Sequence, residues 1–152
     1  MQGDVLFSTM GTTIKTAKTR ENQYGVDFTY QYEFAKVAAE NGVSAYVLVS
    51  SMGASSKSSV FYSRIKGGLE DAVSTLNFRK LIIFRPSILD GNRQEKRAGE
   101  KFGLIISRFI TSFILKNHRP TPVDVLAGKM IRMSLDQTVG FRMIEGAEIF
   151  SV

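Results

Sequence analysis

The segment "SAYVLVSS" (residues 44–51) constrains the fold more than any other part of the sequence. Every residue from Ala45 to Val49 is apolar or aromatic, and two serines follow. A strand with one face in water alternates apolar and polar residues. A strand that is apolar on both faces is typical of the centre of a parallel sheet covered by helices on both sides. The segment therefore predicts a buried central strand that ends in serines.

Strand and helix patterns alternate along the rest of the chain. Further strands are predicted at about 4–9, 80–86 and 142–150, and helices at about 29–41, 59–76 and from Thr121 onward, with Gly42 as a left-handed cap of the first. The polar stretch 14–28 is predicted to be a loop, and the amphipathic stretch 102–115 to be core or a subunit contact. This alternation predicts an α/β protein with a partial doubly wound, mainly parallel sheet of about four strands and flanking helices.

The composition fits one globular domain over residues 1–152. Hydrophobic residues make up 43% of the chain, enough for a real core. The formal charge of +6 comes from scattered basic residues, which either solvate the surface or favour an anionic ligand such as a nucleotide phosphate. No nucleic-acid-binding pattern is present. The absence of cysteine and the single histidine, His118, exclude disulfides and thiolate or histidine metal clusters, so we expect no metal.

The N-terminal residues "MQGDVLFSTMG" lack the basic start and apolar run of a signal peptide. No apolar run approaches the roughly 20 residues that a membrane span needs. We therefore expect a cytoplasmic protein without a membrane span.

The spacing Tyr-x-x-x-Lys occurs twice, at Tyr62/Lys66 and at Tyr32/Lys36. Both pairs fall on predicted helices, where residues four apart share a face. Only Tyr62 follows a strand that ends in serines, and ligands of open α/β sheets bind beyond the carboxyl ends of the strands. We therefore interpret Tyr32 and Lys36 as a structural pair and Tyr62 and Lys66 as candidate catalytic residues.

A proton relay explains why these residue types would lie together. A tyrosine has a pKa of about 10 and is a poor acid–base catalyst at neutral pH, but a nearby ammonium group stabilises the phenolate and lowers that pKa. A serine hydroxyl can hold a carbonyl or alcohol oxygen beside the phenol. Such a set moves a proton during oxidation or reduction of a C–O group, and the hydride requires a nicotinamide cofactor.

Four stretches, in order, carry a family resemblance: "DVLFSTMGTT", "AKVAAENGVSAYVLVSSMGA", "FYSRIKGGLEDAV" and "LIIFRPSILDGNRQEKRAGE". With them the chain resembles the atypical short-chain dehydrogenase/reductase proteins, in particular the group of the Tat-interactive oxidoreductase-like protein. The resemblance implies a Rossmann-like NAD(P)-binding fold and oxidoreductase activity on a small carbonyl or alcohol substrate. It also implies roles for three catalytic residues. Ser51, with Ser50 as the alternate, would orient the substrate, Tyr62 would exchange the proton, and Lys66 would bind the nicotinamide ribose and tune Tyr62.

The resemblance implies further cofactor-binding residues as well. Met10 and Gly11 would line the cofactor path, Arg85 and Ile88 would pass close to the nicotinamide, and Arg93 would reach a cofactor phosphate or the substrate. Each has a plainer alternative: Gly11 as a turn glycine, the two serines as caps of the following loop, and Arg93 as an ion-pair partner of Glu95 or Glu100.

The sequence departs from the family because it lacks the Gly-x-Gly-x-x-Gly loop that cradles the pyrophosphate. Three accounts are open: a fragment of a longer protein, a natural short relative that serves as a non-catalytic binding module, or a site completed by another chain. We favour the fragment. We expect weak or absent binding of NAD or NADP by this chain alone, and a homo-oligomer that covers the bare first strand or the helices at 29–41 and 59–76. A sugar-nucleotide epimerase-like enzyme is the alternative activity.

Overall fold

A computed structural model describes residues 3–90 and 120–151. Arg93, His118 and the amphipathic stretch 102–115 lie outside the described residues. Four parallel strands form the main sheet in the order β1-β2-β3-β6. They are β1 (Val5–Ser8), β2 (Ala45–Val49), β3 (Lys80–Arg85) and β6 (Gly140–Glu145). The predicted α/β class and the mainly parallel four-stranded sheet are confirmed.

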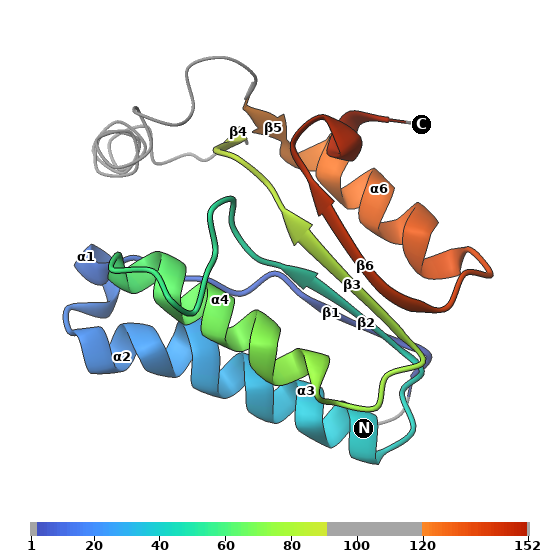
Figure 1. The fold of residues 1–152 in the computed structure, drawn as a ribbon, viewed down its shortest axis with the longest axis horizontal. Coiled ribbons are helices and arrows are strands. Elements are labelled where there is room, and N and C mark those ends of the chain that lie inside the picture. Colours follow the sequence, from blue (N-terminus) through green and yellow to red (C-terminus); the bar gives the residue numbers. More distant parts are fainter. Residues whose placement is uncertain (1–2, 91–119, 152) are drawn as a thin grey trace.

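Helices cover both faces of this sheet (Figure 1). On one face lie α2 (Arg20–Tyr24), the π-helical turn η1 (Gly25–Thr29), α3 (Tyr30–Glu40) and α4 (Phe61–Ser74), and on the other lies α6 (Val123–Leu135). A short parallel pair, β4 (Leu89–Asp90) with β5 (Thr121–Pro122), lies beyond the end of β3. Among the described residues, no helix has the length and apolarity needed to cross a bilayer.

The alternation of β2 explains why both faces are covered. Tyr46 and Leu48 pack with residues of α3 and α4, whereas Val47 and Val49 pack with residues of α6. Every residue of the strand is buried. The apolar clusters on the two faces of the sheet therefore both include residues of β2, as predicted from "AYVLV". Their close packing fixes the position of the polar residues that follow the carboxyl ends of the strands.

The predicted loop at 14–28 is wrong. This stretch forms α1 (Ile14–Ala17), α2 and η1, and the last two continue into α3. The hydroxyl of Thr13 accepts a hydrogen bond from Thr16 N at 3.2 Å, and that of Thr19 accepts one from Asn22 N at 3.1 Å. These threonine caps satisfy amide groups at the start of each helix and so stabilise helices in a polar sequence.

The predicted last strand is correct only in its first part. Glycine at 146 adopts a left-handed φ of +59°, and residues Gly146–Phe150 form a 3-10 helix, η2, instead of more strand. The predicted left-handed cap at Gly42 is confirmed, with φ +76° directly after α3.

Candidate functional site

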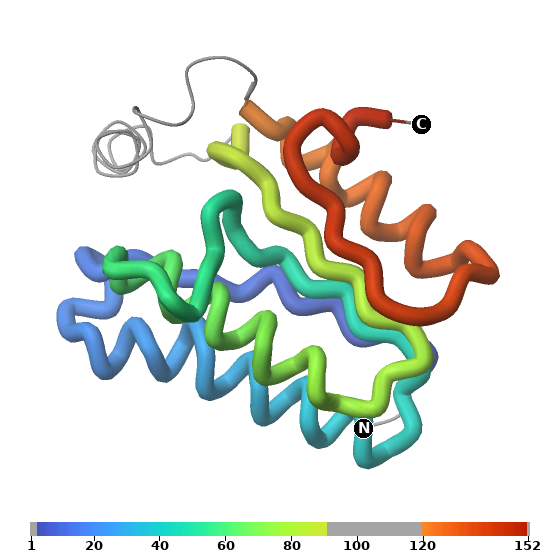
Figure 2. Tube along the Cα trace, in the orientation of Figure 1, coloured from blue at the N-terminus to red at the C-terminus, as the bar shows by residue number. Residues whose placement is uncertain are grey.

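The serines after β2 lie at the carboxyl end of the sheet, and the connection to α4 loops out beyond that end before the helix returns (Figure 2). The backbone of this connection is tied to the segment after β3, since Ser50 N donates to Phe84 O at 2.7 Å and Met52 N to Pro86 O at 3.0 Å. Ser50 is buried, and its hydroxyl has no hydrogen-bond partner among the described residues. Ser51 is partly buried, and its Oγ donates to Met52 O at 3.4 Å.

Close packing holds α4 against this connection. Ser55 N donates to Ser63 O in the first turn of α4 at 3.0 Å. One turn further along, Gly67 lies directly against the backbone of Ser55 and Ser56, and a Cβ at this position would collide with both. Gly67 therefore lets the helix approach closely enough to bring Tyr62 and Lys66 to the serines.

The structure brings Tyr62 together with Ser51. Burial raises the pKa of Tyr62 to about 12, the charge of Asp27 adds to the rise, and a hydrogen bond with the Ser51 side chain opposes it. The expectation that Lys66 lowers the pKa of Tyr62 is therefore wrong for this structure. The reason is geometric: Lys66 Nζ donates to Val49 O at 3.1 Å and lies one helical turn beyond the tyrosine.

Lys66 is a buried cation with few partners. It is 2% exposed, and within residues 3–90 and 120–151 its ammonium group makes one hydrogen bond, to Val49 O, and no direct ion pair. Burial lowers the pKa of Lys66, and the nearby charges of Asp27 and Glu70 oppose that shift. Two of its three N–H donors therefore make no hydrogen bond to these residues.

The other predicted site residues follow neighbouring strands. Met10 and Gly11 come directly after β1, both exposed, and Ile88 follows β3 and is 49% exposed. All three therefore lie at the same edge of the sheet as Ser51. The Arg85 guanidinium is instead bound by carboxylates: its Nε donates to Glu70 Oε1 at 3.0 Å, and Nη1 lies 3.7 Å from Glu145 Oε2.

Sequence reasoning missed Asp27, a fully buried carboxylate in η1. Thr12 N donates to its two oxygens at 3.2 and 3.3 Å, and a Cβ on Gly11 would lie 3.4 Å from its Oδ1. The signal was a stripe at a spacing of four, since Gln23, Asp27 and Gln31 are all buried and continue into buried Ala35. The adjacent Ser8 at the end of β1 donates to Gln31 Oε1 at 2.8 Å.

Tyr32 and Lys36, the Tyr-x-x-x-Lys pair that we interpreted as structural, lie in α3. Tyr32 packs at the edge of the core below the sheet, and its ring stacks on Phe28 with the ring centres 6.0 Å apart. Lys36 is exposed. Neither residue follows the carboxyl end of a strand, in keeping with our interpretation of the pair as part of the helix.

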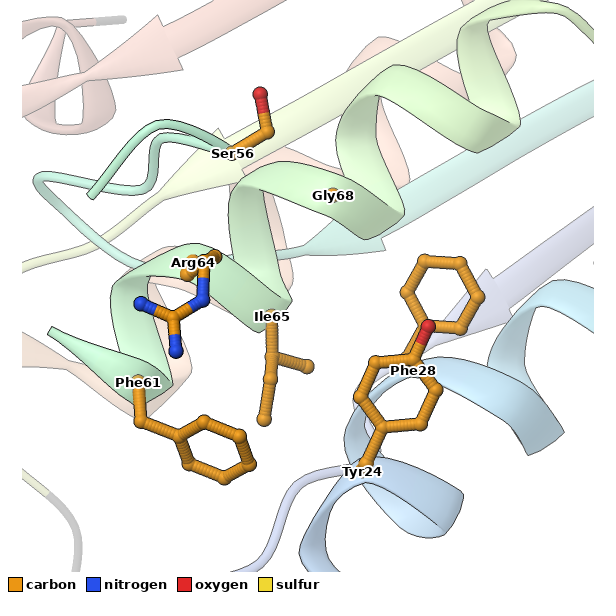
Figure 3. Close-up of a pocket in the computed structure, with 7 residues that line it drawn as sticks. All are labelled: Tyr24, Phe28, Ser56, Phe61, Arg64, Ile65 and Gly68. Atoms are coloured by element: carbon orange, nitrogen blue, oxygen red, sulfur yellow. The ribbon is translucent and has the colours of Figure 1, made fainter. Parts of the chain in front are cut away.

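A surface pocket of about 260 Å³ lies between α2, η1 and α4, lined by Tyr24, Phe28, Ser56, Phe61, Arg64, Ile65 and Gly68 (Figure 3). Its α4 residues form a stripe distinct from that of Tyr62 and Lys66. The Arg64 guanidinium is held by the carbonyls of Ser58 and Ser59. The pocket therefore lies apart from the proton-relay residues.

In the described part of the chain, no cluster of acidic or histidine side chains has the geometry of a metal site.

Comparison with known proteins decides the family. No family model matches the chain. The protein named "Protein FMP52, mitochondrial" from Eremothecium gossypii is 33% identical over 156 residues, which cover 98% of this chain and 69% of that protein. The chain belongs to the Fmp52 family. A second Fmp52 protein, from Emericella nidulans, is 39% identical over 114 residues, 75% of this chain and 47% of that protein.

The chain spans about half the length of several Fmp52 proteins that it matches. These relatives are named as mitochondrial proteins. The expectation of a cytoplasmic protein is therefore wrong. It rested on the lack of a recognisable targeting segment, and the residues that build a folded core carry no information on the compartment.

Solved structures share the fold. The dTDP-4-dehydrorhamnose reductase from Bacillus anthracis, crystallised with NADP, gives a TM-score of 0.66 at 16% identity over 93% of this chain and 55% of that one. A UDP-galactose 4-epimerase gives a TM-score of 0.66 at 15% identity over 96% and 57%. This Fmp52 chain thus has the Rossmann-like fold of NAD(P)-dependent reductases and epimerases.

Proposed function

We propose that this Fmp52 chain carries the proton-relay part of an NAD(P)-dependent oxidoreductase of the short-chain dehydrogenase type. The observation that carries the proposal is the Lys66 ammonium group, which is buried and makes, among the described residues, a single hydrogen bond to Val49 O. A buried charge with so few partners costs stability. Such a cost is typical of positions kept for chemistry.

The geometry supports a defined set of proton steps on a carbonyl substrate. The Ser51 hydroxyl donates a hydrogen bond to the carbonyl oxygen and holds it beside the phenol. Tyr62 is protonated at neutral pH, because burial raises its pKa to about 12, and it gives its proton to the same oxygen as the alcohol forms. Lys66, one helical turn beyond the tyrosine, would bind the cofactor ribose in this arrangement and does not lower the pKa of the phenol.

The residues present fit the nicotinamide end of the cofactor. A bound nicotinamide would supply the hydride to the carbonyl carbon. The open N–H donors of Lys66 suit ribose hydroxyls, and the turn at Met10 and Gly11 lies exposed at the same edge. Among the described residues, no glycine-rich turn opens a long helix after a strand, so contacts to the pyrophosphate are lacking there. Arg93 remains a candidate for a phosphate contact. We therefore expect NAD or NADP to bind this chain weakly.

Two finer points belong to the same proposal. The four matched stretches favour the group of the Tat-interactive oxidoreductase-like protein within the superfamily.

The β1 strand lies at an edge of the sheet, and a free apolar edge invites pairing with another chain. We therefore propose a homo-oligomer, and light scattering that gives a monomer at high micromolar concentration contradicts it.

The test is oxidation of NADPH by the product of the longest reading frame that contains this sequence, with a panel of aldehydes and ketones. Net oxidation with one alcohol formed per NADPH supports a reductase, and Tyr62→Phe then lowers the rate sharply while the matched control Tyr32→Phe leaves it nearly unchanged. Interconversion of a sugar nucleotide with no net oxidation supports the epimerase alternative, since enzymes of this fold include a UDP-galactose 4-epimerase. Absence of any turnover favours a non-catalytic binding module.

A further inference from the structure

Asp27 joins two parts of the site that the chain brings together from far apart. It is 0% exposed and lies in the π-helical turn η1, a kind of irregularity that is frequent at functional sites. Both of its carboxylate oxygens lie within hydrogen-bond distance of Thr12 N, in the turn that follows β1. Gln23, one turn earlier, also hydrogen-bonds to the carboxylate.

The charges around Asp27 leave Lys66 as its electrostatic partner. Lys66 lies near two carboxylates, Asp27 and Glu70. Glu70 is already paired with Arg85 through two hydrogen bonds, and Arg85 also faces Glu145. Within the described residues, the Asp27 carboxylate has no arginine partner, and the other titratable group that faces it is the phenol of Tyr62. Burial raises the pKa of Asp27, and the nearby charge of Lys66 opposes that rise. Asp27 and Lys66 are thus two buried groups of opposite charge that, among the described residues, form no ion pair with a third group.

We propose that Asp27 is a positioning residue, which anchors the cofactor-facing turn through the Thr12 amide and supplies the counter-charge that keeps the Lys66 ammonium group ionised. The role of Lys66 in catalysis rests on the proposed function, whereas the coupling of Asp27 to Lys66 does not. One carboxylate thus links the segment after β1 to the helix that carries Tyr62. A ligand that moves the Thr12 turn would change the field at Lys66.

Two variants separate the two roles. Asp27→Asn removes the charge and keeps an oxygen that can accept from the Thr12 amide, whereas Asp27→Ala removes both. Glu33→Gln, an exposed acid on α3, is the matched control for loss of one negative charge. The readouts are the pKa of Lys66, followed through its Cε signal by NMR on the isolated chain, and hydrogen exchange of the Thr12 amide.

We expect the pKa of Lys66 to be lower in Asp27→Asn than in the unchanged chain, and unchanged in Glu33→Gln. Thr12 exchange should accelerate roughly tenfold in Asp27→Ala, the value of one hydrogen bond, and much less in Asp27→Asn. An unchanged or higher pKa of Lys66 in Asp27→Asn overturns the proposal. Equal exchange rates in the two Asp27 variants overturn the anchoring role.

The unchanged chain provides a second test that needs no variant to fold. If the two charges are coupled, the Asp27 Cγ signal shows a step at the pH where Lys66 titrates, and independent titrations overturn the proposal. None of these readouts requires turnover, so they stand even if no substrate is found. Where turnover is found, Asp27→Asn should shift the pH profile of kcat, a change that a purely structural role would not cause.

Discussion

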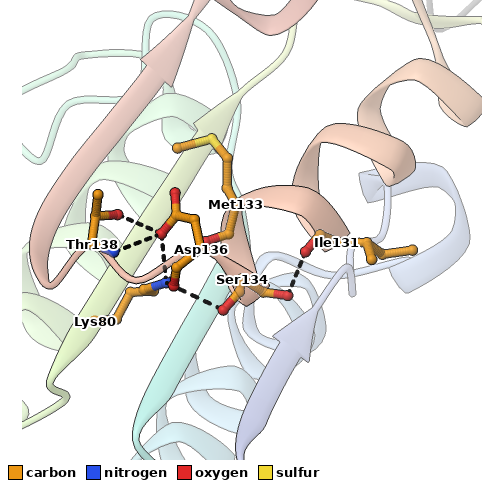
Figure 4. Close-up of polar contacts among 6 residues, drawn as sticks. All are labelled: Lys80, Ile131, Met133, Ser134, Asp136 and Thr138. Carbon is orange, nitrogen blue, oxygen red and sulfur yellow. Dashed lines mark hydrogen bonds and ion pairs between the residues drawn. The ribbon is translucent and has the colours of Figure 1, made fainter. Parts of the chain in front are cut away.

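Two buried lysines mark opposite ends of the sheet, and they are bonded in different ways. Lys80 begins β3 at the amino end, and its Nζ donates to the carbonyls of Met133, Ser134 and Asp136 and to Asp136 Oδ1, at 2.6–3.2 Å (Figure 4). Lys66 lies at the carboxyl end and, in the part of the chain that the structure describes, donates only to Val49 O. The ammonium group of Lys80 is saturated, whereas that of Lys66 has donors that make no hydrogen bond to any described residue.

The two lysines differ in how far the described residues satisfy their charge. Lys80 satisfies the orphan carbonyls at the end of α6 and so fixes that helix to the sheet. Lys66 is buried as well, but within residues 3–90 and 120–151 its ammonium group makes one hydrogen bond. Buried charges with few partners are frequent at functional sites, which supports the proposed role of the carboxyl end of the sheet.

The largest effect should come from Lys66→Met. We expect turnover to fall by roughly 10²–10⁴-fold, the range for loss of a group that assists proton transfer. The midpoint of thermal unfolding should change little, because removal of the buried ammonium group relieves its desolvation cost but also takes the counter-charge from buried Asp27. Steady-state kinetics and a melting curve on the same preparation check both parts. A variant with full activity contradicts the comparison.

Lys80→Met should do the reverse. The substitution leaves the carbonyls at the end of α6 without their donor, and we expect the free energy of unfolding to fall by about 2–3 kcal/mol. Activity at a temperature where the variant is folded should be unchanged. Urea unfolding measures the loss, and a stability equal to that of the unchanged chain would remove the structural half of the argument.

A glycine pair sharpens the comparison between α4 and α6. Gly67→Ala forces a Cβ into the backbone of Ser55 and Ser56, and should destabilise the fold by about 1–3 kcal/mol and displace the connection that carries Ser51. A Cβ at Gly128, within α6, would meet no described residue of another element within 4 Å. Gly128→Ala should therefore stabilise by about 0.5–1 kcal/mol through helix propensity. Urea unfolding of both variants measures the difference, and equal effects at the two positions contradict the close approach of α4.

The smallest expected effect is on the pH dependence of stability, through Asp136 beside Lys80 at the amino end of the sheet. The hydrogen bond from Lys80 lowers the pKa of Asp136 from 3.8 to about 2, with help from Thr138. A carboxyl group with a depressed folded-state pKa contributes stability that is present above pH 3.8 and is lost as the pH falls through about 2. Asp136→Asn should flatten the stability curve across that window. Because Asp136 is exposed, salt should weaken the effect.

The sequence was sufficient to predict the sheet, and it assigned the candidate residues to the carboxyl edge of that sheet. The apolar run of β2 and the serines after it carried most of this information, because burial on both faces leaves few alternatives for such a strand. The choice of Tyr62 over Tyr32 depended on the same strand. The threonine caps at Thr13 and Thr19 were readable signals that would have predicted helices in the polar stretch.

Other features depend on contacts that no local pattern contains. The acceptors of Lys80 lie 53–56 residues further along the chain, so nothing near Lys80 in the sequence distinguishes it from an exposed lysine. Asp27 reaches the site through a π-helical turn, which shifts the helical phase of the residues that follow it. The pairing of Arg85 with Glu70 likewise arises only when β3 and α4 lie together.

Titration of the chain with NADPH, followed by NMR, tests most directly the claim that the cofactor binds at the carboxyl end of the sheet. We predict that the signals of Lys66 and Tyr62 shift and that the signal of Lys80 does not. The dissociation constant should be weaker than about 1 mM, because one or two charge-assisted hydrogen bonds fall short of the roughly 8 kcal/mol that micromolar binding needs. Shifts centred on Lys80, or no shift at Lys66 and Tyr62 at saturation, would contradict the account.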